Sequence, residues 1–106
     1  MCGRFAQIRE EEELMKSLSV HHCEVSVETS YNIAPGADIS IIHQQDGRRV
    51  LDSRRWGLIP FWAKEGGRGM INARSETVSE KPSFRHAFSK RRCLIPSSGF
   101  YEWEKT

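Results

Sequence analysis

The sequence has no long hydrophobic run, and this absence excludes a membrane-spanning helix. Its longest apolar stretches, such as residues 58–62, fall far short of the roughly 20 residues that cross a bilayer. No apolar segment of signal-peptide length follows Met1. Cysteine is also scarce, and an odd count of three without an export signal predicts reduced thiols instead of a disulfide framework. We therefore expect an intracellular protein of a reducing compartment, with no membrane partner.

The motifs of cofactor binding are missing as well. The chain has no glycine-rich loop of the P-loop or dinucleotide-binding kind. Cys23 follows His21 and His22, but no second pair of cysteines or histidines stands at zinc-finger spacing. We therefore expect neither a metal nor a small-molecule cofactor. What is present, 38% hydrophobic and 28% charged residues in a chain of 106, is typical of one globular domain.

Charges of the two signs are unevenly distributed, although the net charge is only +2. Residues 1–47 carry three basic and eight acidic side chains, whereas residues 48–92 carry twelve basic and four acidic ones. Five aromatic residues stand within this basic segment: Trp56, Phe61, Trp62, Phe84 and Phe88. Basic groups suit a phosphate backbone and aromatic rings suit unstacked bases, so the segment favours single-stranded nucleic acid as a partner. A solvated charged face over an ordinary core explains the same pattern.

The apolar pattern predicts an α+β domain with mostly antiparallel strands and a few short helices. Asp46-Gly47 predicts a hairpin between a strand around residues 39–42 and its partner at 48–56. The other expected elements are an extended segment at 2–7, helices at 9–19 and 83–90, loops at 20–36 and 57–69, and strands at 93–96 and 100–104 around a turn. Because the last strand runs almost to Thr106, we expect the chain to be cut inside its domain, either as a fragment of a longer protein or as a naturally truncated relative.

Cys2 has the most distinctive chemistry of any residue in the chain. Initiator methionine is commonly removed before a small residue, and its loss leaves Cys2 with a free α-amine beside its thiol. The α-amine of a chain has a pKa of about 7.7–8.0, so a useful neutral fraction exists at pH 7. Such an amine attacks an aldehyde to give a Schiff base, and the thiolate then closes a thiazolidine ring on the same carbon. The competing interpretation is a cysteine without any special role.

Two further sets of polar residues stand out. In the segment 71–77, alternation would place Asn72, Arg74 and Glu76 on one face of an extended chain. Glu102 lies between two aromatic residues, and partial burial among their rings would suit its carboxylate to acid–base chemistry. A solvated strand edge and a surface carboxylate are the alternative interpretations of these two sets.

Five motifs together resemble those of one family. They occur in the family's order and are Met1-Cys2-Gly3-Arg4-Phe5, Tyr31-Asn32-Ile33-Ala34-Pro35-Gly36, Trp56-Gly57-Leu58-Ile59-Pro60, Ile71-Asn72-Ala73-Arg74-Ser75-Glu76-Thr77 and Gly99-Phe100-Tyr101-Glu102-Trp103. This set is similar to that of SRAP proteins, the SOS-response-associated peptidases. The resemblance implies a single SRAP-like domain over residues 1–106, of which the C-terminal part is missing. It also implies a barrel-like, mostly antiparallel sheet.

The resemblance implies a function as well. SRAP proteins bind single-stranded DNA and form a covalent thiazolidine cross-link with abasic sites through the N-terminal cysteine, which protects the lesion. By position, Cys2 is the nucleophile, Asn72 holds the sugar or the Cys2 amine, and Glu102 is the acid–base group. The implied DNA-binding residues are Arg4 and Arg74 at phosphates and Pro35 and Trp62 against bases, together with Asn32 and Glu76.

The family also uses a histidine in the second part of its domain, and none of the four histidines of this chain stands in a matching motif. Two other functions stay open: a thiol peptidase that removes its own Met1 through Cys2, and a non-catalytic module that binds single strands. Missing strands would leave an open sheet edge, through which we expect self-association. With DNA as the partner, the expected compartment is the cytoplasm or nucleoid of a bacterium or the nucleus of a eukaryote.

Overall fold

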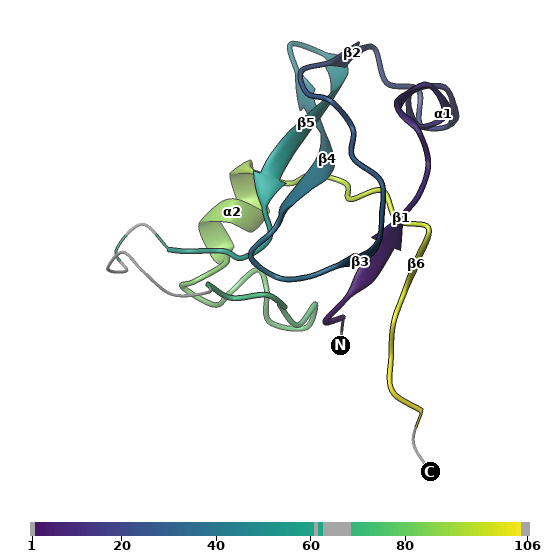
Figure 1. The fold of residues 1–106 in the computed structure, drawn as a ribbon. Coiled ribbons are helices and arrows are strands. Elements are labelled where there is room, and N and C mark those ends of the chain that lie inside the picture. The colour runs from purple at the N-terminus through teal and green to yellow at the C-terminus, as the bar shows by residue number, and fades with distance from the viewer. Residues whose placement is uncertain (1, 61, 63–68, 105–106) are drawn as a thin grey trace.

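The computed structural model describes residues 2–60, 62 and 69–104. These residues form β1 (Phe5–Gln7), α1 (Glu11–Ser17), β2 (His22–Cys23), β3 (Ser30–Ile33), β4 (Asp38–Gln45), β5 (Arg48–Arg55), α2 (Arg85–Lys90) and β6 (Gly99–Phe100). The strands make two three-stranded sheets, in the orders β3-β1-β6 and β2-β5-β4. Figure 1 shows α1 and α2 on opposite sides of the β4–β5 hairpin. All strand pairs except β2–β5 are antiparallel, so the predicted α+β class is confirmed.

The β4–β5 hairpin is the longest paired unit, and its turn is the one that the sequence predicts. Asp46 and Gly47 have φ angles of 53° and 76°. Both central residues of a type I′ turn take such left-handed values, and this turn matches the twist of the flanking strands. The pairing continues in register from Gln45–Arg48 to Asp38–Arg55. The hairpin therefore forms from local turn chemistry and an apolar strand.

β4 is buried on both faces and separates two small apolar clusters. Alternation along the strand sends Ile42 to one side and Ile39 and Ile41 to the other. The first cluster contains Leu14 of α1, Val20, Ile42 and Leu51. The second cluster contains Phe5, Ile39 and Ile41, with Cys2, Ile33 and Trp56 packed against it. The second cluster is therefore the apolar support beneath the N-terminal cysteine.

β1 is the central strand of the sheet at the N-terminus. Its Phe5 lies opposite Ile33 of β3 on one side and Phe100 of β6 on the other. A bond of 2.9 Å from the Tyr101 amide to the Arg4 carbonyl oxygen extends the pairing beyond β6. Residues 4–6 and 99–101 are thus held side by side.

The sheets do not close into the barrel-like arrangement that the resemblance implied. Within the described residues, β3 and β6 are the edge strands of their sheet, and β6 has two residues. The strand expected at 100–104 is therefore limited to Phe100, and residues 101–104 have no regular structure. The strand expected at 93–96 is a single bridge between Leu94 and Ile42.

Other sequence predictions differ in detail. The loop expected at 20–36 contains β2 and β3, which become strands because β5 and β1 offer them partners and not because their own pattern alternates. The helices expected at 9–19 and 83–90 are present but shorter. Phe61 and residues 63–68 of the expected 57–69 loop lie outside the described residues. No helix in the described part of the chain is long and apolar enough to cross a membrane.

The segment 71–77 forms no strand, and from residue 75 onward it is turned and not extended as predicted. Residues 71–74 have no regular structure, and residues 75–80 form successive turns. The Thr77 amide donates to the Arg74 carbonyl oxygen at 3.2 Å, which closes the first of these turns. Asn72, Arg74 and Glu76 consequently do not share one strand face, because the period-2 alternation holds only for extended backbone.

Candidate functional site

Cys2, Asn72 and Glu102 line one open hollow of about 610 Å³, although they stand far apart in the sequence. We call it the Cys2 hollow. Its other lining residues are Phe5, Ile39, Trp56, Ile71, Ile95, Ser97 and Phe100. A mainly apolar wall with a few convergent polar groups is the usual make-up of a small-molecule site. The structure therefore brings together the three residues for which the resemblance implied catalytic roles.

Cys2 lies on the chain just before β1 and is half-buried. Its Sγ donates to the Arg4 carbonyl oxygen at a long distance of 3.7 Å. On its inner side it packs against the cluster of Phe5, Ile39 and Ile41. Reactive cysteines are typically accessible in this way, whereas fully buried ones are inert. The thiol is thus supported from below and open to an incoming molecule.

Trp56 fixes the segment that carries Asn72. Its ring meets Phe5 edge-on, with ring centroids 5.5 Å apart and planes at 62°. Its Nε1 donates to the Ile71 carbonyl oxygen at 3.0 Å. Sequence reasoning missed this role, although Trp56 opens one of the five motifs. The available signal was its indole N–H, which needs an acceptor when the ring packs inside a protein.

A second contact joins the two ends of the chain segment between Leu58 and Met70. Leu58 and Met70 form an isolated antiparallel bridge with two bonds of 2.9 Å. Gly69, beside it, has a φ of 75°, and a Cβ there would lie 2.9 Å from the Gly57 carbonyl carbon. The bridge and the Trp56 bond therefore hold the residues just before Asn72 at two adjacent points.

Glu102 reaches the hollow because β6 pairs with β1. The expected burial of its carboxylate among aromatic rings is wrong, since Glu102 is exposed. Its neighbours do not enclose it, because Tyr101 is 54% exposed and Trp103 is 96% exposed. The surface-carboxylate interpretation is therefore correct for its exposure. Glu102 nevertheless lines the same hollow as Cys2.

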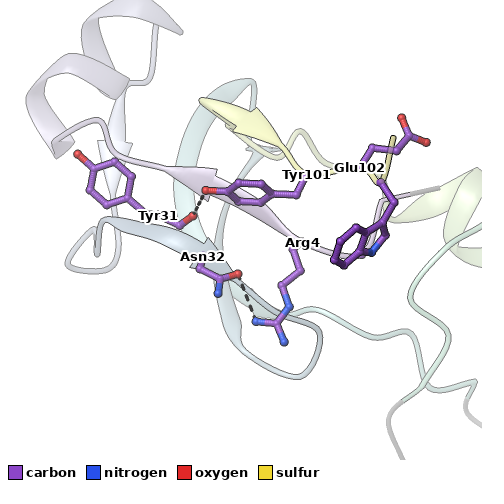
Figure 2. A pocket seen from close by; sticks show the side chains of 7 residues that line it. Arg4, Tyr31, Asn32, Tyr101 and Glu102 are labelled. Carbon is purple, nitrogen blue, oxygen red and sulfur yellow. Dashed lines mark hydrogen bonds between the residues drawn. The ribbon is translucent and has the colours of Figure 1, made fainter. Parts of the chain in front are cut away.

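Glu102 also borders a second hollow of about 880 Å³, which we call the Arg4 hollow. Its other lining residues are Gly3, Arg4, Tyr31, Asn32, Tyr101 and Trp103. Figure 2 shows Arg4 Nη1 donating to Asn32 Oδ1 at 3.2 Å and the Tyr101 hydroxyl donating to the Tyr31 carbonyl oxygen at 2.7 Å. Because a guanidinium has five N–H donors, Arg4 retains donors for a further ligand. The Arg4 hollow thus combines a cation, an amide and aromatic surfaces.

The remaining residues that the resemblance implied for DNA binding line neither hollow. Pro35 is half-buried in the turn between β3 and β4. Trp62 is 55% exposed. Arg74 and Glu76 are both exposed and, unlike Asn72, do not line the Cys2 hollow.

The other thiols and the histidines lie elsewhere. Burial raises the pKa of the Cys23 thiol above its ordinary value, and this thiol donates to the Val25 carbonyl oxygen at 2.8 Å. Burial also raises the pKa of the Cys93 thiol. All three cysteines are free. No histidine lines the Cys2 hollow, and the described residues contain no group of acidic, histidine and cysteine side chains that could hold a metal.

An accessible thiol, an amide and a carboxylate around one partly apolar hollow define a candidate site for covalent chemistry on a small electrophile. The chain belongs to the SOS response associated peptidase (SRAP) family, whose model matches residues 1–106. This match confirms the resemblance that the five motifs carry.

Curated relatives and a solved structure support the assignment. The abasic site processing protein YoqW of Bacillus subtilis is 43% identical over 109 residues, covering 99% of this chain and 49% of that protein. The abasic site processing protein YedK of Escherichia coli is 31% identical, covering 99% and 49%. A crystal structure of a Bordetella bronchiseptica protein matches with a TM-score of 0.74 at 27% identity, covering 95% of this chain and 50% of that one. The chain thus spans about half the length of these proteins.

Proposed function

We propose that this chain binds single-stranded DNA and forms a thiazolidine cross-link with an abasic site through Cys2, once Met1 has been removed. The observation that carries the proposal is the shared hollow of Cys2, Asn72 and Glu102. The names of the relatives point the same way, since they are abasic site processing proteins. Such a function would locate the protein with the DNA of its cell.

The chemistry requires no oxidant or reductant. Glu102 first accepts the proton of the sugar's C1′ hydroxyl and passes it to the ring oxygen O4′, so that the C1′–O4′ bond breaks and the sugar opens to an aldehyde and a 4′-hydroxyl. The neutral α-amine of Cys2 then adds to the aldehyde carbon, and the former carbonyl oxygen leaves as water with two protons, one from the amine and one from the thiol, relayed by Glu102. The thiolate then adds to the imine carbon and the nitrogen keeps one proton. Amine, thiol and aldehyde thus become one thiazolidine and one water.

The remaining polar groups position the strand. Asn72 has both amide donors and an acceptor, so it suits the sugar hydroxyls or the Cys2 amine. We assign Arg4, held by Asn32, and Arg74 to phosphates beside the lesion, because arginine pairs with phosphate through parallel N–H donors. In the same proposal Pro35 and Trp62 lie against bases, and Glu76 belongs to the DNA-facing turn segment.

A thiol peptidase is the less favoured function. Such enzymes usually activate the cysteine with an adjacent histidine. Among the described residues, none of the histidines lines the Cys2 hollow. A module that only binds single strands differs from the proposal in forming no covalent adduct, so one experiment separates the two.

The test is an intact-mass measurement before and after incubation with a single-stranded oligonucleotide that carries one abasic site. We expect loss of Met1 and a DNA adduct that survives denaturation. Cys2→Ala should abolish the adduct, whereas Cys93→Ala, which removes a free thiol that does not line the Cys2 hollow, should leave it unchanged. A folded chain that has lost Met1 and binds the oligonucleotide without forming an adduct would contradict the proposal.

A further inference from the structure

Residues 81–92 carry a strip of positive charge that the Cys2 hollow does not use. The strip contains five basic residues and no acidic one: Lys81, Arg85, Lys90, Arg91 and Arg92. All five are exposed, and α2 buries none of its residues. None of the five forms an ion pair with another described residue.

Both ends of the segment that carries the basic strip return to the Cys2 hollow. Ile71 and Asn72 line the hollow before the strip, and Ile95 and Ser97 line it afterwards. Leu94 is fixed to Ile42 of β4 by two bonds of 2.8 Å. Since Arg92 precedes Ile95 by three residues, their Cα atoms are at most about 11 Å apart. The C-terminal end of the basic strip therefore lies near the hollow.

One cation of the strip is held in place. The Arg92 guanidinium lies 5.1 Å from the centre of the Phe88 ring, which is 38% exposed. Such a contact orients the guanidinium while its N–H donors stay available. The acidic residues of α1, Glu11 to Glu13, lie on the other side of the hairpin (Figure 1). The charge asymmetry of the sequence thus becomes a spatial one, which favours a polyanion on the α2 side.

We propose that the basic strip binds the phosphate backbone of the single strand on one side of the abasic site. This inference rests on the proposed function, because it takes single-stranded DNA as the ligand. The basic strip would be a second DNA-contact region besides the Arg4 hollow. It would bind the strand without taking part in the chemistry at Cys2.

The test compares two triple variants of equal charge. The strip variant is Lys81→Gln, Arg85→Gln and Lys90→Gln, which leaves the Arg92–Phe88 contact intact. The control variant is Arg9→Gln, Lys16→Gln and Arg48→Gln, three exposed cations outside the strip. The affinity for a fluorescent single-stranded oligonucleotide without a lesion is measured against salt concentration. Circular dichroism of both variants checks the fold.

Each phosphate contact contributes about 0.7 to the slope of log affinity against log salt for a single strand. The strip variant should therefore lose about 2 from the slope, and the control variant should retain the slope of the unmodified chain. Between 50 and 200 mM salt, the unmodified chain should then lose roughly 20-fold more affinity than the strip variant. Equal slopes for the two variants would overturn the inference, because net charge and not the strip would then be responsible.

The position of the strip is tested with two oligonucleotides that carry the abasic site at the 5′ or the 3′ end. At sub-saturating protein, the strip variant should form adduct more slowly with only one of them. Equal loss on both would overturn the one-sided placement. If the unmodified chain binds the lesion-free strand but forms no adduct, the proposed chemistry is wrong. The comparison of salt slopes still shows in that case whether the basic strip binds the strand.

Discussion

Replacing Trp56 by phenylalanine tests whether the Cys2 hollow depends on the segment that Trp56 holds. Phenylalanine keeps a ring against Phe5 but removes the donor that reaches the Ile71 carbonyl oxygen at 3.0 Å. The loss of one such bond costs about 1 kcal/mol of unfolding free energy. For a domain of about this size, the midpoint of thermal unfolding should fall by roughly 4–8 °C.

The effect on the reaction should exceed the effect on stability. A domain with about 5 kcal/mol of stability stays more than 99% folded after losing about 1 kcal/mol, so unfolding cannot slow the reaction measurably. Asn72 follows the released carbonyl directly, and a displacement of about 1 Å in an active site costs on the order of 100-fold in rate. We expect adduct formation to slow by roughly 10- to 100-fold, with unchanged affinity for a lesion-free strand.

The measurement is the second-order rate of adduct formation, followed by intact mass beside thermal unfolding of the same preparations. Cys23→Ala is the control, because it also removes a donor to a backbone carbonyl oxygen, that of Val25, but beside the first apolar cluster and away from the Cys2 hollow. It should lower the unfolding midpoint without slowing adduct formation. A lower unfolding midpoint with an unchanged rate would refute the reasoning. Trp56 would then support the fold without placing Asn72.

Four further perturbations separate chemistry, fold and assembly. Glu102→Gln should slow adduct formation by about 10²–10⁴-fold at constant DNA affinity if the carboxylate moves protons, and equal rates would remove it from the mechanism. A hydrogen bond from the Ser53 backbone N–H, and then Arg54, lower the pKa of Asp52 below its ordinary 3.8. The Asp52 carboxylate therefore stabilises the fold above about pH 4 and loses this effect as the pH falls through the pKa of the folded state. Asp52→Asn should therefore lower the free energy of unfolding at pH 7 by about 0.5 kcal/mol, and the unfolding midpoint should fall by a few degrees. The difference between the variant and the unmodified chain should disappear in acid. Gly69→Ala places a Cβ 2.9 Å from backbone at a φ of 75°, and calorimetry should show about 1–3 kcal/mol of destabilisation. Self-association through the open β6 edge should weaken in Phe100→Lys, because Phe100 is an exposed residue of that strand, and sedimentation velocity at increasing concentration would show no change if that edge is not the contact.

Local signals in the sequence predicted the parts of the fold that local physics determines. The Asp46-Gly47 dipeptide specifies the left-handed turn and hence the register of the hairpin. β3 was missed because its residues, Ser30 to Ile33, carry little apolar alternation and become a strand only by pairing with β1. The segment 71–77 was predicted as extended because its polar residues alternate, yet turns from residue 75 onward satisfy its backbone instead.

The candidate site, like the fold, could be predicted from the sequence only in part. The motifs identified Cys2, Asn72 and Glu102 because residue identity and order are visible in a sequence. The exposure of Glu102 could not be predicted, since it depends on where Tyr101 and Trp103 pack and both remain exposed. Trp56 could not be assigned a role from sequence because its hydrogen bond reaches Ile71, which stands 15 positions further along the chain.

The three residues at the Cys2 hollow meet because of one short strand. β1 extends from Cys2, pairs with β6 and so brings Glu102 beside the N-terminus. Its Phe5 also touches Trp56, whose bond to Ile71 brings Asn72 to the same place. Each connection is a contact of one or two residues, so the hollow depends on β1 remaining paired at both edges. A perturbation of β1 should therefore disrupt the site before it disrupts the β4–β5 hairpin, whose turn and register are specified within residues 38–55.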